Sequence, residues 1–339
     1  MKKTIRVLAL LLIAAMTAAT FSSCGLLGTV GIGLLTDGDF EGLFGGIFGD
    51  DGPHLVYELS DDGEGYIVVS CDYYEYLVEI PESYGGKPVV GIEAYAFEFC
   101  HNLKSVTIPY TVEYIGSDAF FGCYSLIEVV NNSYLNINLG EYENGCVALY
   151  AISVHSGESK IEEYENGYLF FTEYDGENYL VGKTNEPEML HLPDSYKGYP
   201  YSIYSHAFYN YRIFTVFIPN SVLMIGQSAF GGCSSLEAVN FEHDSSLMLI
   251  GEDAFYGCIN LKDIDIPAKV FCIGAGAFRE TGLEEVYFEN PQGWTCFYSY
   301  GGTEYIDIPS EMLYDEYDAA NCLAETFCDY DWICEKNRP

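Results

Sequence analysis

The side chains of this 339-residue chain that could do chemistry are twelve cysteines, six histidines and fifty-one carboxylates. The histidines are scattered without the spacing that metal sites need, and the chain has no phosphate-binding glycine loop. Neither H-E-x-x-H nor G-x-S-x-G occurs in the sequence. Cys322, Cys328 and Cys334 follow one another at intervals of six residues, which matches no zinc pattern. These observations predict a protein with no catalytic site and no cofactor.

Four other cysteines recur at one position of a repeated pattern, four residues after an alanine: Cys100, Cys123, Cys233 and Cys258. Two copies of the pattern have Tyr211 and Thr281 there, and in both the interval to the next core valine is one residue shorter. The copies that carry cysteine therefore have one more residue between the alanine and the next core valine. A small apolar side chain packs well in the corner that this longer segment forms. We expect these thiols to be buried and mainly free. Eleven cysteines, an odd number, remain after Cys24.

The repeated pattern places Ala-Phe four residues after an isoleucine and occurs six times. Its phenylalanines are Phe97, Phe120, Phe208, Phe230, Phe255 and Phe278. They are 23, 88, 22, 25 and 23 residues apart. Self-similarity at about 23 residues is typical of a solenoid, in which each coil buries its core face only against its neighbours.

Each coil needs elements that fit into this period, which is too short for a crossover helix. Alternating apolar residues such as Val239 and Phe241 predict a strand, and an Ile-Pro pair such as Ile218-Pro219 ends it. A second short strand leads to a glycine, for example Gly226, where we expect a sharp corner with positive φ. The Ala-Phe segment predicts one helical turn with phenylalanine in the core.

These residues, read as I-G-x-x-A-F-x-x-C-x-x-L-x-x-V-x-I-P, resemble the BspA-type leucine-rich repeat. The resemblance covers roughly residues 89–127 and 202–288. It implies a β-rich α/β solenoid, right-handed and curved, with N- and C-terminal caps. It also implies non-catalytic binding at a bacterial cell surface, without naming a ligand.

The N-terminus is typical of a secreted lipoprotein. Lys2, Lys3 and Arg6 precede an apolar run, and residues 1–23 are predicted to be a signal peptide. The sequence Phe21-Ser22-Ser23-Cys24-Gly25 resembles a bacterial lipobox with Phe21 in place of the usual aliphatic residue, so Cys24 is the predicted lipidation site. The alternative is ordinary signal-peptidase cleavage. Residues 24–52 are rich in glycine and predict a flexible tether.

The remaining chain divides into an N-terminal β cap, two repeat blocks, a β-rich insert and a C-terminal cap. The expected ranges are 53–88 for the first cap, 89–130 and 202–290 for the blocks, 131–201 for the insert and 291–339 for the last cap. Two runs in the insert predict a β-hairpin, and its end echoes the N-terminal cap, as if the solenoid began again. Asp318 is the predicted N-cap of a C-terminal helix.

The charge balance restricts the partners. Acidic residues outnumber basic ones by 51 to 14, and such a surface repels nucleic acids and anionic lipid headgroups. We expect a non-catalytic protein on the extracellular face, anchored to the membrane by the lipid on Cys24, that binds a host or bacterial protein or glycan. Two alternatives remain open: an enzyme with its site in residues 131–201, and a purely structural envelope protein.

The candidate ligand face follows from the strand alternation, because residues between the core positions must point outward. It comprises Ser105, Thr107, Glu128, Thr215, Phe217, Asn240, Asp263, Asp265, Glu285 and Tyr287. Phe217 and Tyr287 have no packing role visible in the sequence, and exposed aromatics often mark binding surfaces. Asp263, Asp265 and Glu285 are a weak candidate for a Ca²⁺ site or for a basic group. Neutralisation by Lys262 and simple solvation are the alternatives.

Overall fold

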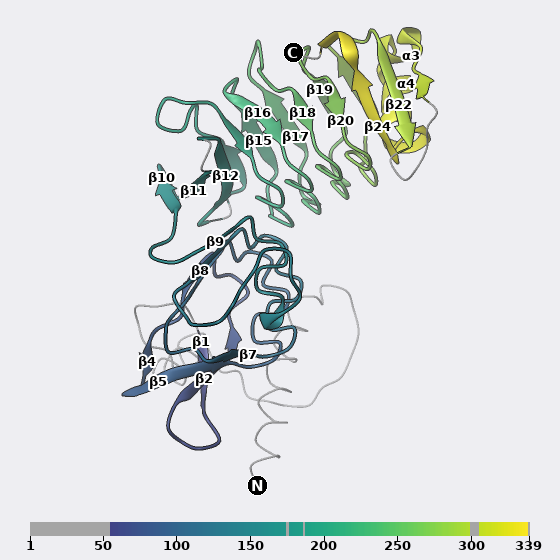
Figure 1. The fold of residues 1–339 in the computed structure, drawn as a ribbon. Coiled ribbons are helices and arrows are strands. Elements are labelled where there is room, and N and C mark those ends of the chain that lie inside the picture. The colour runs from purple at the N-terminus through teal and green to yellow at the C-terminus, as the bar shows by residue number, and fades with distance from the viewer. Residues whose placement is uncertain (1–54, 174–175, 186, 299–304, 338–339) are drawn as a thin grey trace, which may run out of the picture. The chain divides into compact units, whose positions relative to one another are not determined.

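The computed structural model describes residues 55–173, 176–185, 187–298 and 305–337. The predicted signal peptide, the lipidation site at Cys24 and the tether lie outside the described residues. From residue 55 onward the chain forms parallel β coils in two consecutive runs, and the strands β15 to β20 lie in chain order in Figure 1. The predicted solenoid fold is confirmed.

The first block begins with an antiparallel hairpin that covers its end coil. Its strands are β1 (Leu55–Leu59), β2 (Tyr66–Cys71), β3 (Leu77–Glu79), β4 (Ser83–Tyr84), β5 (Lys87–Ile92), β6 (Ser105–Ile108), β7 (Tyr114–Ile115), β8 (Glu128–Asn131) and β9 (Ser153–His155). Strands β3, β6, β8 and β9 form one parallel sheet, and β2, β5 and β7 pair in parallel in a second sheet. Strand β2 pairs in parallel with β5, so the hairpin β1–β2 covers the edge of β5.

The first block continues past the boundary expected at residue 130. Strand β9 pairs in parallel with β8, and the short helix η1 (Asn144–Cys146) occupies the place of the Ala-Phe turn. Phe120 donates its N–H to the Gly145 carbonyl at 2.7 Å, as Phe97 does to Ala119 at 2.7 Å. The coil is therefore kept by backbone hydrogen bonds although its side-chain pattern is lost. We call residues 55–155 the first block.

The second block, residues 161–334, begins with a cap of the same construction. Its strands are β10 (Ile161–Tyr164), β11 (Tyr168–Thr172), β12 (Asn178–Lys183), β13 (Met189–His191), β14 (Tyr201–Ile203), β15 (Thr215–Ile218), β16 (Val222–Ile225), β17 (Ala238–Phe241), β18 (Leu249–Ile250), β19 (Asp263–Ile266), β20 (Cys272–Ile273) and β21 (Glu285–Phe288). The antiparallel strands β10–β12 lead into β14, as β1 and β2 lead into β5. The insert is thus a second N-terminal cap.

The last elements close the other end of the solenoid. They are β22 (Trp294–Tyr298), β23 (Tyr305–Asp307), α3 (Ser310–Tyr314), α4 (Glu316–Asn321), the π-helix η2 (Cys322–Thr326), β24 (Tyr330–Cys334) and η3 (Glu335–Asn337). Strand β24 runs antiparallel to β20 and covers its edge. The N-cap of α4 is Asp315 rather than Asp318, because its carboxylate accepts the N–H groups of Tyr317 and Asp318.

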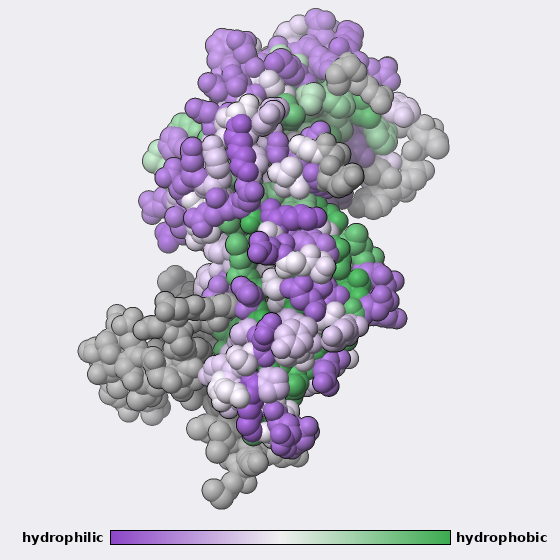
Figure 2. All heavy atoms as spheres, turned by 60° about the vertical axis from the view of Figure 1, so that its left-hand side comes forward, coloured by the Kyte–Doolittle hydropathy of each residue, from purple (hydrophilic) through white to green (hydrophobic). Residues whose placement is uncertain are grey.

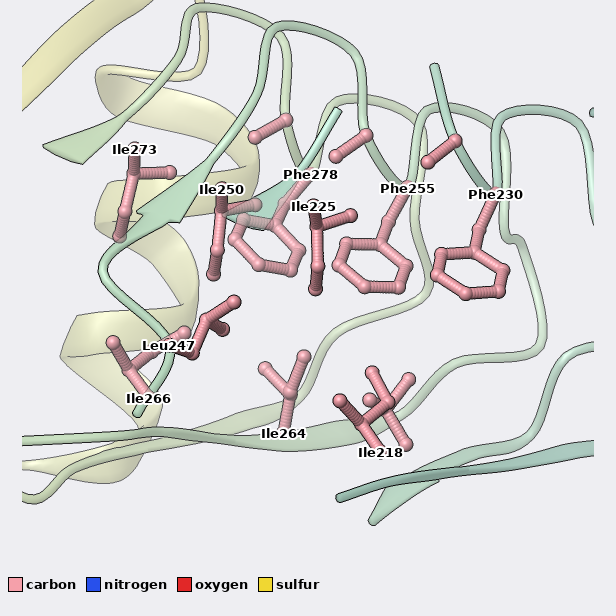
Figure 3. Close-up of a cluster of buried hydrophobic side chains, with 14 of the residues drawn as sticks. Ile218, Ile225, Phe230, Leu247, Ile250, Phe255, Ile264, Ile266, Ile273 and Phe278 are labelled. Atoms are coloured by element: carbon pink, nitrogen blue, oxygen red, sulfur yellow. The ribbon is translucent and has the colours of Figure 1, made fainter. Parts of the chain in front are cut away.

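The six phenylalanines of the pattern form the centre of the two cores, and each is at most 1% exposed. Phe97 stacks on Phe120 with ring centroids 4.5 Å apart. In the second block the stack runs from Phe208 to Phe278 with spacings of 5.3 to 5.4 Å. Figure 3 shows Phe230, Phe255 and Phe278 in one row, with Ile225, Ile250 and Ile273 in a second row. Each ring meets its own copy in the next coil.

The repeat cysteines have the predicted packing role and a second role that the sequence did not reveal. The Sγ atoms of Cys123, Cys233 and Cys258 lie 3.0, 3.1 and 3.2 Å from the Phe carbonyl of the preceding coil. Each thiol therefore donates to a carbonyl that ends a helical turn. Burial raises the pKa of Cys258 to about 12, so this thiol is a poor nucleophile. All eleven cysteines of the described residues are free.

The glycine after each core isoleucine is required for space and not, as expected, for positive φ. A Cβ on Gly226, Gly251 or Gly274 would lie 2.4–2.7 Å from a backbone nitrogen of the preceding coil. The positive φ occurs two residues later, at Ser228 (φ 49°) and Asp253 (φ 52°). Successive coils therefore touch at the glycine, and the polar residue after it turns the chain.

Candidate functional site

The outward positions of five strands form the candidate site in the second block, which we call the strand face. It consists of Met189, His191, Thr215, Phe217, Ala238, Asn240, Asp263, Asp265, Glu285 and Tyr287. Strands β13, β15 and β17 are paired in register, as are β19 and β21. Paired strands are about 4.8 Å apart, and β17 packs against β19 where the two sheets adjoin, so these side chains lie on neighbouring sheets of the same side. Figure 2 shows hydrophilic residues over much of the visible part of this half of the chain.

One row of the strand face carries aromatic rings. His191 lies opposite Phe217 in the register, and their rings stack with centroids 4.2 Å apart and planes 6° apart. Tyr287, at the other end of the row, is 52% exposed. Phe217 is half-buried. The predicted aromatic positions therefore lie on the surface, and His191 joins them.

Sequence reasoning missed His191 as part of this surface. A signal was present, because residues 188–193 resemble residues 79–81, which begin with the last residue of β3, the edge strand of the parallel sheet in the first block. That echo indicates that Met189–His191 is the first strand of a new sheet, with His191 at an outward position. Its side chain therefore enlarges the apolar surface that Phe217 presents.

The acidic end of the strand face lies on β19 and β21. Asp263 is opposite Glu285, Asp265 is opposite Tyr287, and all four residues are exposed. Burial, Glu289 and Asp263 together raise the pKa of Asp265, so adding negative charge here is unfavourable. Lys262 does not neutralise this group, because its ammonium pairs with Glu284 at 3.2 Å.

The weak candidate for a metal site is not formed. Among the described residues, no group of three or more His, Cys, Asp or Glu side chains is arranged to hold a metal ion. Asp263, Asp265 and Glu285 are therefore separate surface carboxylates.

Ser105 and Glu128 were expected on the ligand face, and this expectation is wrong. Both are buried, at 3% and 0% exposure, and Thr107 is half-buried. The Glu128 carboxylate accepts hydrogen bonds from Ser105 Oγ at 2.7 Å, from Lys160 N at 2.7 Å and from Ser159 Oγ, and it contacts His155 Nε2 at 2.9 Å. Burial favours a raised pKa, but these hydrogen bonds outweigh it and lower the pKa of Glu128. Residues 155–160 of the same chain therefore cover the outward side of this strand position.

The segment expected to be an insert contains a shallow depression, which has a volume of about 320 Å³. It is lined by Thr172, Gly176, Asn178, Tyr196, Lys197 and Tyr199. Lys197 pairs with Glu162, and its Nζ lies 4.9 Å from the centroid of the Tyr196 ring. The six lining residues include no nucleophile with an adjacent base. Tyr196 also donates its hydroxyl to Glu162 of β10 at 2.9 Å.

Within the part of the chain that the structure describes, no helix has the length and apolar character needed to cross a membrane.

Comparisons with known proteins identify the repeat. The family model described as the BspA type leucine rich repeat region matches residues 78–168 and 201–322, in six copies. These ranges make up more than half of the chain. No curated protein matches the sequence.

Several solved structures are similar. A leucine-rich repeat protein from Bacteroides capillosus is 32% identical, with 39% of this chain and 100% of that chain covered and a TM-score of 0.35. A leucine rich cell surface protein from Faecalibacterium prausnitzii is 19% identical, with 71% and 96% covered and a TM-score of 0.32. The pneumococcal vaccine antigen PcpA is 20% identical, with 70% and 66% covered and a TM-score of 0.37.

Proposed function

Because this chain belongs to the BspA-type leucine-rich repeat family, we propose that it is a non-catalytic binding protein of the bacterial cell surface. The partner is a protein or a glycan, and it is held by the strand face of the second block. Proteins built from this repeat are generally not enzymes, which supports the proposal. The sequence of the N-terminus supports a lipid anchor at Cys24 and a position on the extracellular face.

The observation that carries the proposal is the row of unlike side chains on the two adjoining sheets β13-β15-β17 and β19-β21. The stacked pair His191–Phe217 and the Tyr287 ring present apolar faces that need no packing role in the fold. Asp263 and Asp265 add negative charge on β19, where Asp265 lies opposite Tyr287. Aromatic anchors next to fixed polar groups are characteristic of protein recognition surfaces, and a preformed sheet loses little entropy on binding.

Replacing the aromatic or the acidic side chains of the strand face is expected to weaken binding without unfolding the chain. The partner is first identified by screening the purified ectodomain on glycan and matrix-protein arrays. Phe217→Ala with Tyr287→Ala should then reduce affinity by roughly tenfold or more, as loss of interface anchors does. Asp263→Asn with Asp265→Asn should lower affinity for a basic partner, and the loss should shrink at high salt.

The matched control carries Tyr74→Ala and Asp61→Asn, because both residues lie in the first block away from the strand face. It should bind like the wild type. If both strand-face variants keep full affinity, the binding site lies elsewhere and this assignment is wrong.

The anchor makes a separate prediction. In a bacterium with the lipoprotein pathway, the wild-type chain should be recovered in the membrane fraction and should incorporate labelled fatty acid. Cys24→Ala should abolish the labelling and release the chain or block its processing. Cys328→Ala, which changes a half-buried cysteine of the C-terminal cap, should not alter either result. A soluble, unlabelled wild type would contradict the anchor.

A further inference from the structure

A buried lysine lies where the two blocks meet. Lys104 is only 1% exposed, although it occupies the position just before a strand that Lys262 occupies in the second block. The Lys262 side chain is 54% exposed and paired with Glu284. Lys104 is therefore buried by contacts with the other block rather than by its place in the coil.

The Lys104 ammonium reaches the first Ala-Phe turn of the second block. Its Nζ lies 3.2 Å from the His206 carbonyl and 3.4 Å from the Ala207 carbonyl, and Ser125 Oγ donates to the His206 carbonyl at 3.2 Å. Gly182 on β12 makes room for this side chain, since a Cβ there would lie 3.0 Å from Lys104 Cε. Both acceptors of the ammonium are neutral, and no ion pair joins Lys104 to a carboxylate of the described residues. A buried cation without an anion is costly.

Other groups that can gain positive charge surround the same contact. The charges that act on the His206 imidazole are those of Lys104 and His101. The Tyr124 ring stacks between the two imidazoles, with centroids 5.8 Å from His101 and 6.0 Å from His206. Tyr209 meets both imidazoles edge-on. The titratable groups against His206 are thus the Lys104 amine, the His101 imidazole and two phenols.

The rest of the contact is apolar. Ile127 of the first block packs in one cluster with Leu169, Phe171 and Val181 of the second cap. These side chains are at most 2% exposed. In the cap of the first block the equivalent of Val181 is Val69, which is half-buried. The second cap is therefore apolar on both faces because one face is covered by the first block.

We propose that the cluster of Lys104, His101 and His206 is an acid-sensitive latch between the two blocks, closed while its imidazoles are neutral and loosened when they gain protons. The two blocks can then change their relative orientation when the surroundings become acidic. This proposal concerns the joint between the blocks and does not depend on which partner the strand face binds.

The direction of the pH effect follows from burial. Burial lowers the pKa of Lys104 to about 7 and, together with Lys104 and His101, lowers the pKa of His206 to about 4. The open state binds protons more readily at both groups, so acidification favours it. Protonation of Lys104 increasingly favours the open state as the pH falls from 10.5, the ordinary pKa of a lysine, to about 7. Protonation of His206 does the same as the pH falls from 6.5 to about 4. The pKa of Glu128 is lowered, so its carboxylate stabilises the closed state until the pH falls below the ordinary pKa of a glutamate.

The test measures how often the joint opens. In the full chain, Val181→Cys places a thiol in the apolar contact, and its labelling by dithiodipyridine, which reacts at acid pH, is followed by peptide mass spectrometry. The labelling rate divided by that of the unfolded peptide gives the opening constant. From pH 7.5 to 5 this constant should rise by roughly tenfold or more, since the pKa of His206 differs by more than 2 between the states.

Adding His206→Asn should remove most of this rise, because asparagine tolerates the positive φ of this position and does not titrate in this range. Lys104→Met should lower the opening constant at neutral pH. Two matched controls, His243→Asn and Lys262→Met, change exposed groups and should leave the pH response unchanged. Cys258, buried in the core of the second block, reports general unfolding in the same sample.

Three outcomes would overturn the proposal. They are a labelling rate that does not change with pH, an equal rise in the chain that also carries His206→Asn, and a parallel rise at the introduced thiol and at the native core thiol. If the histidine variant fails to fold, the comparison of the introduced thiol with the native core thiol still decides the question. An opening constant at neutral pH that Lys104→Met does not lower would also contradict the proposal.

Discussion

Phe230→Ala is expected to lower the free energy of unfolding by about 3–5 kcal/mol. Phe230 is 0% exposed and stacks on Phe208 and Phe255, so its removal opens a cavity between two coils. The backbone on both sides is fixed by the hydrogen bonds between the Phe N–H and Ala C=O groups, and it cannot collapse into the space. Denaturant unfolding followed by circular dichroism measures the change.

Phe121→Ala is the matched control. Phe121 belongs to the same kind of turn as Phe230, next to the buried Phe120, but its side chain is 37% exposed. Its removal should cost less than about 1 kcal/mol. A small loss for Phe230→Ala, equal to that of the control, would contradict the stacked core.

Glu128→Ala is expected to cost about 2–4 kcal/mol, because it removes a buried carboxylate that is the shared acceptor of three donors, one of which, Ser105 Oγ, is itself buried. The carboxylate is fully buried and ties Ser105 of one coil to Ser159 and to the N–H of Lys160 in the segment that leads to the second cap. Glu285→Ala removes the same side chain from the equivalent, exposed strand position. That control should change stability by less than about 0.5 kcal/mol.

Glu128→Ala should also alter how the free energy of unfolding depends on acid pH. A carboxylate whose pKa is lowered by folding stabilises the fold above its ordinary pKa of 4.5, and this stability is lost as the pH falls through the lowered value. The wild type should therefore lose stability more steeply than Glu128→Ala between about pH 5 and pH 3. Identical slopes would show that Glu128 is not held as an anion in the fold.

The core of both blocks could be predicted because each repeated residue meets its own copy. Ile225 lies beside Ile250, and Phe230 lies beside Phe255, so the spacing of the pattern in the sequence is the spacing of the coils. The aromatic and acidic positions of the strand face in the second block follow from the same alternation. This logic needs only local contacts between adjacent coils.

What could not be predicted depends on backbone contacts or on segments that meet from a distance. The coil that ends in β9 has lost the pattern and keeps only the hydrogen bond from Phe120 to Gly145. Burial of Glu128 is caused by residues about thirty positions later in the chain. One signal was available for the joint between the blocks. Residues 168–171 are four consecutive apolar residues, which indicates a strand covered on both faces.

The repeated cap explains why one chain contains two blocks. The hairpin β1–β2 begins the first block, and the hairpin β11–β12 begins the second in the same way, each followed by a parallel strand pair. A solenoid start of this kind normally exposes its outer face, as β1 does with its largely exposed side chains. In the second cap that face is apolar and is covered by the first block, so the two blocks form a jointed unit.

Carboxyl footprinting of the complex between the ectodomain and the partner that the arrays identify tests the proposed binding face most directly. Carbodiimide-driven labelling of each carboxylate, with and without the partner, reports which of them become covered. We predict that Asp263, Asp265 and Glu285 lose most of their labelling in the complex, while the exposed Asp61 and Asp62 of the first hairpin keep theirs. Unchanged labelling of the three strand-face carboxylates in a saturated complex would contradict the assignment.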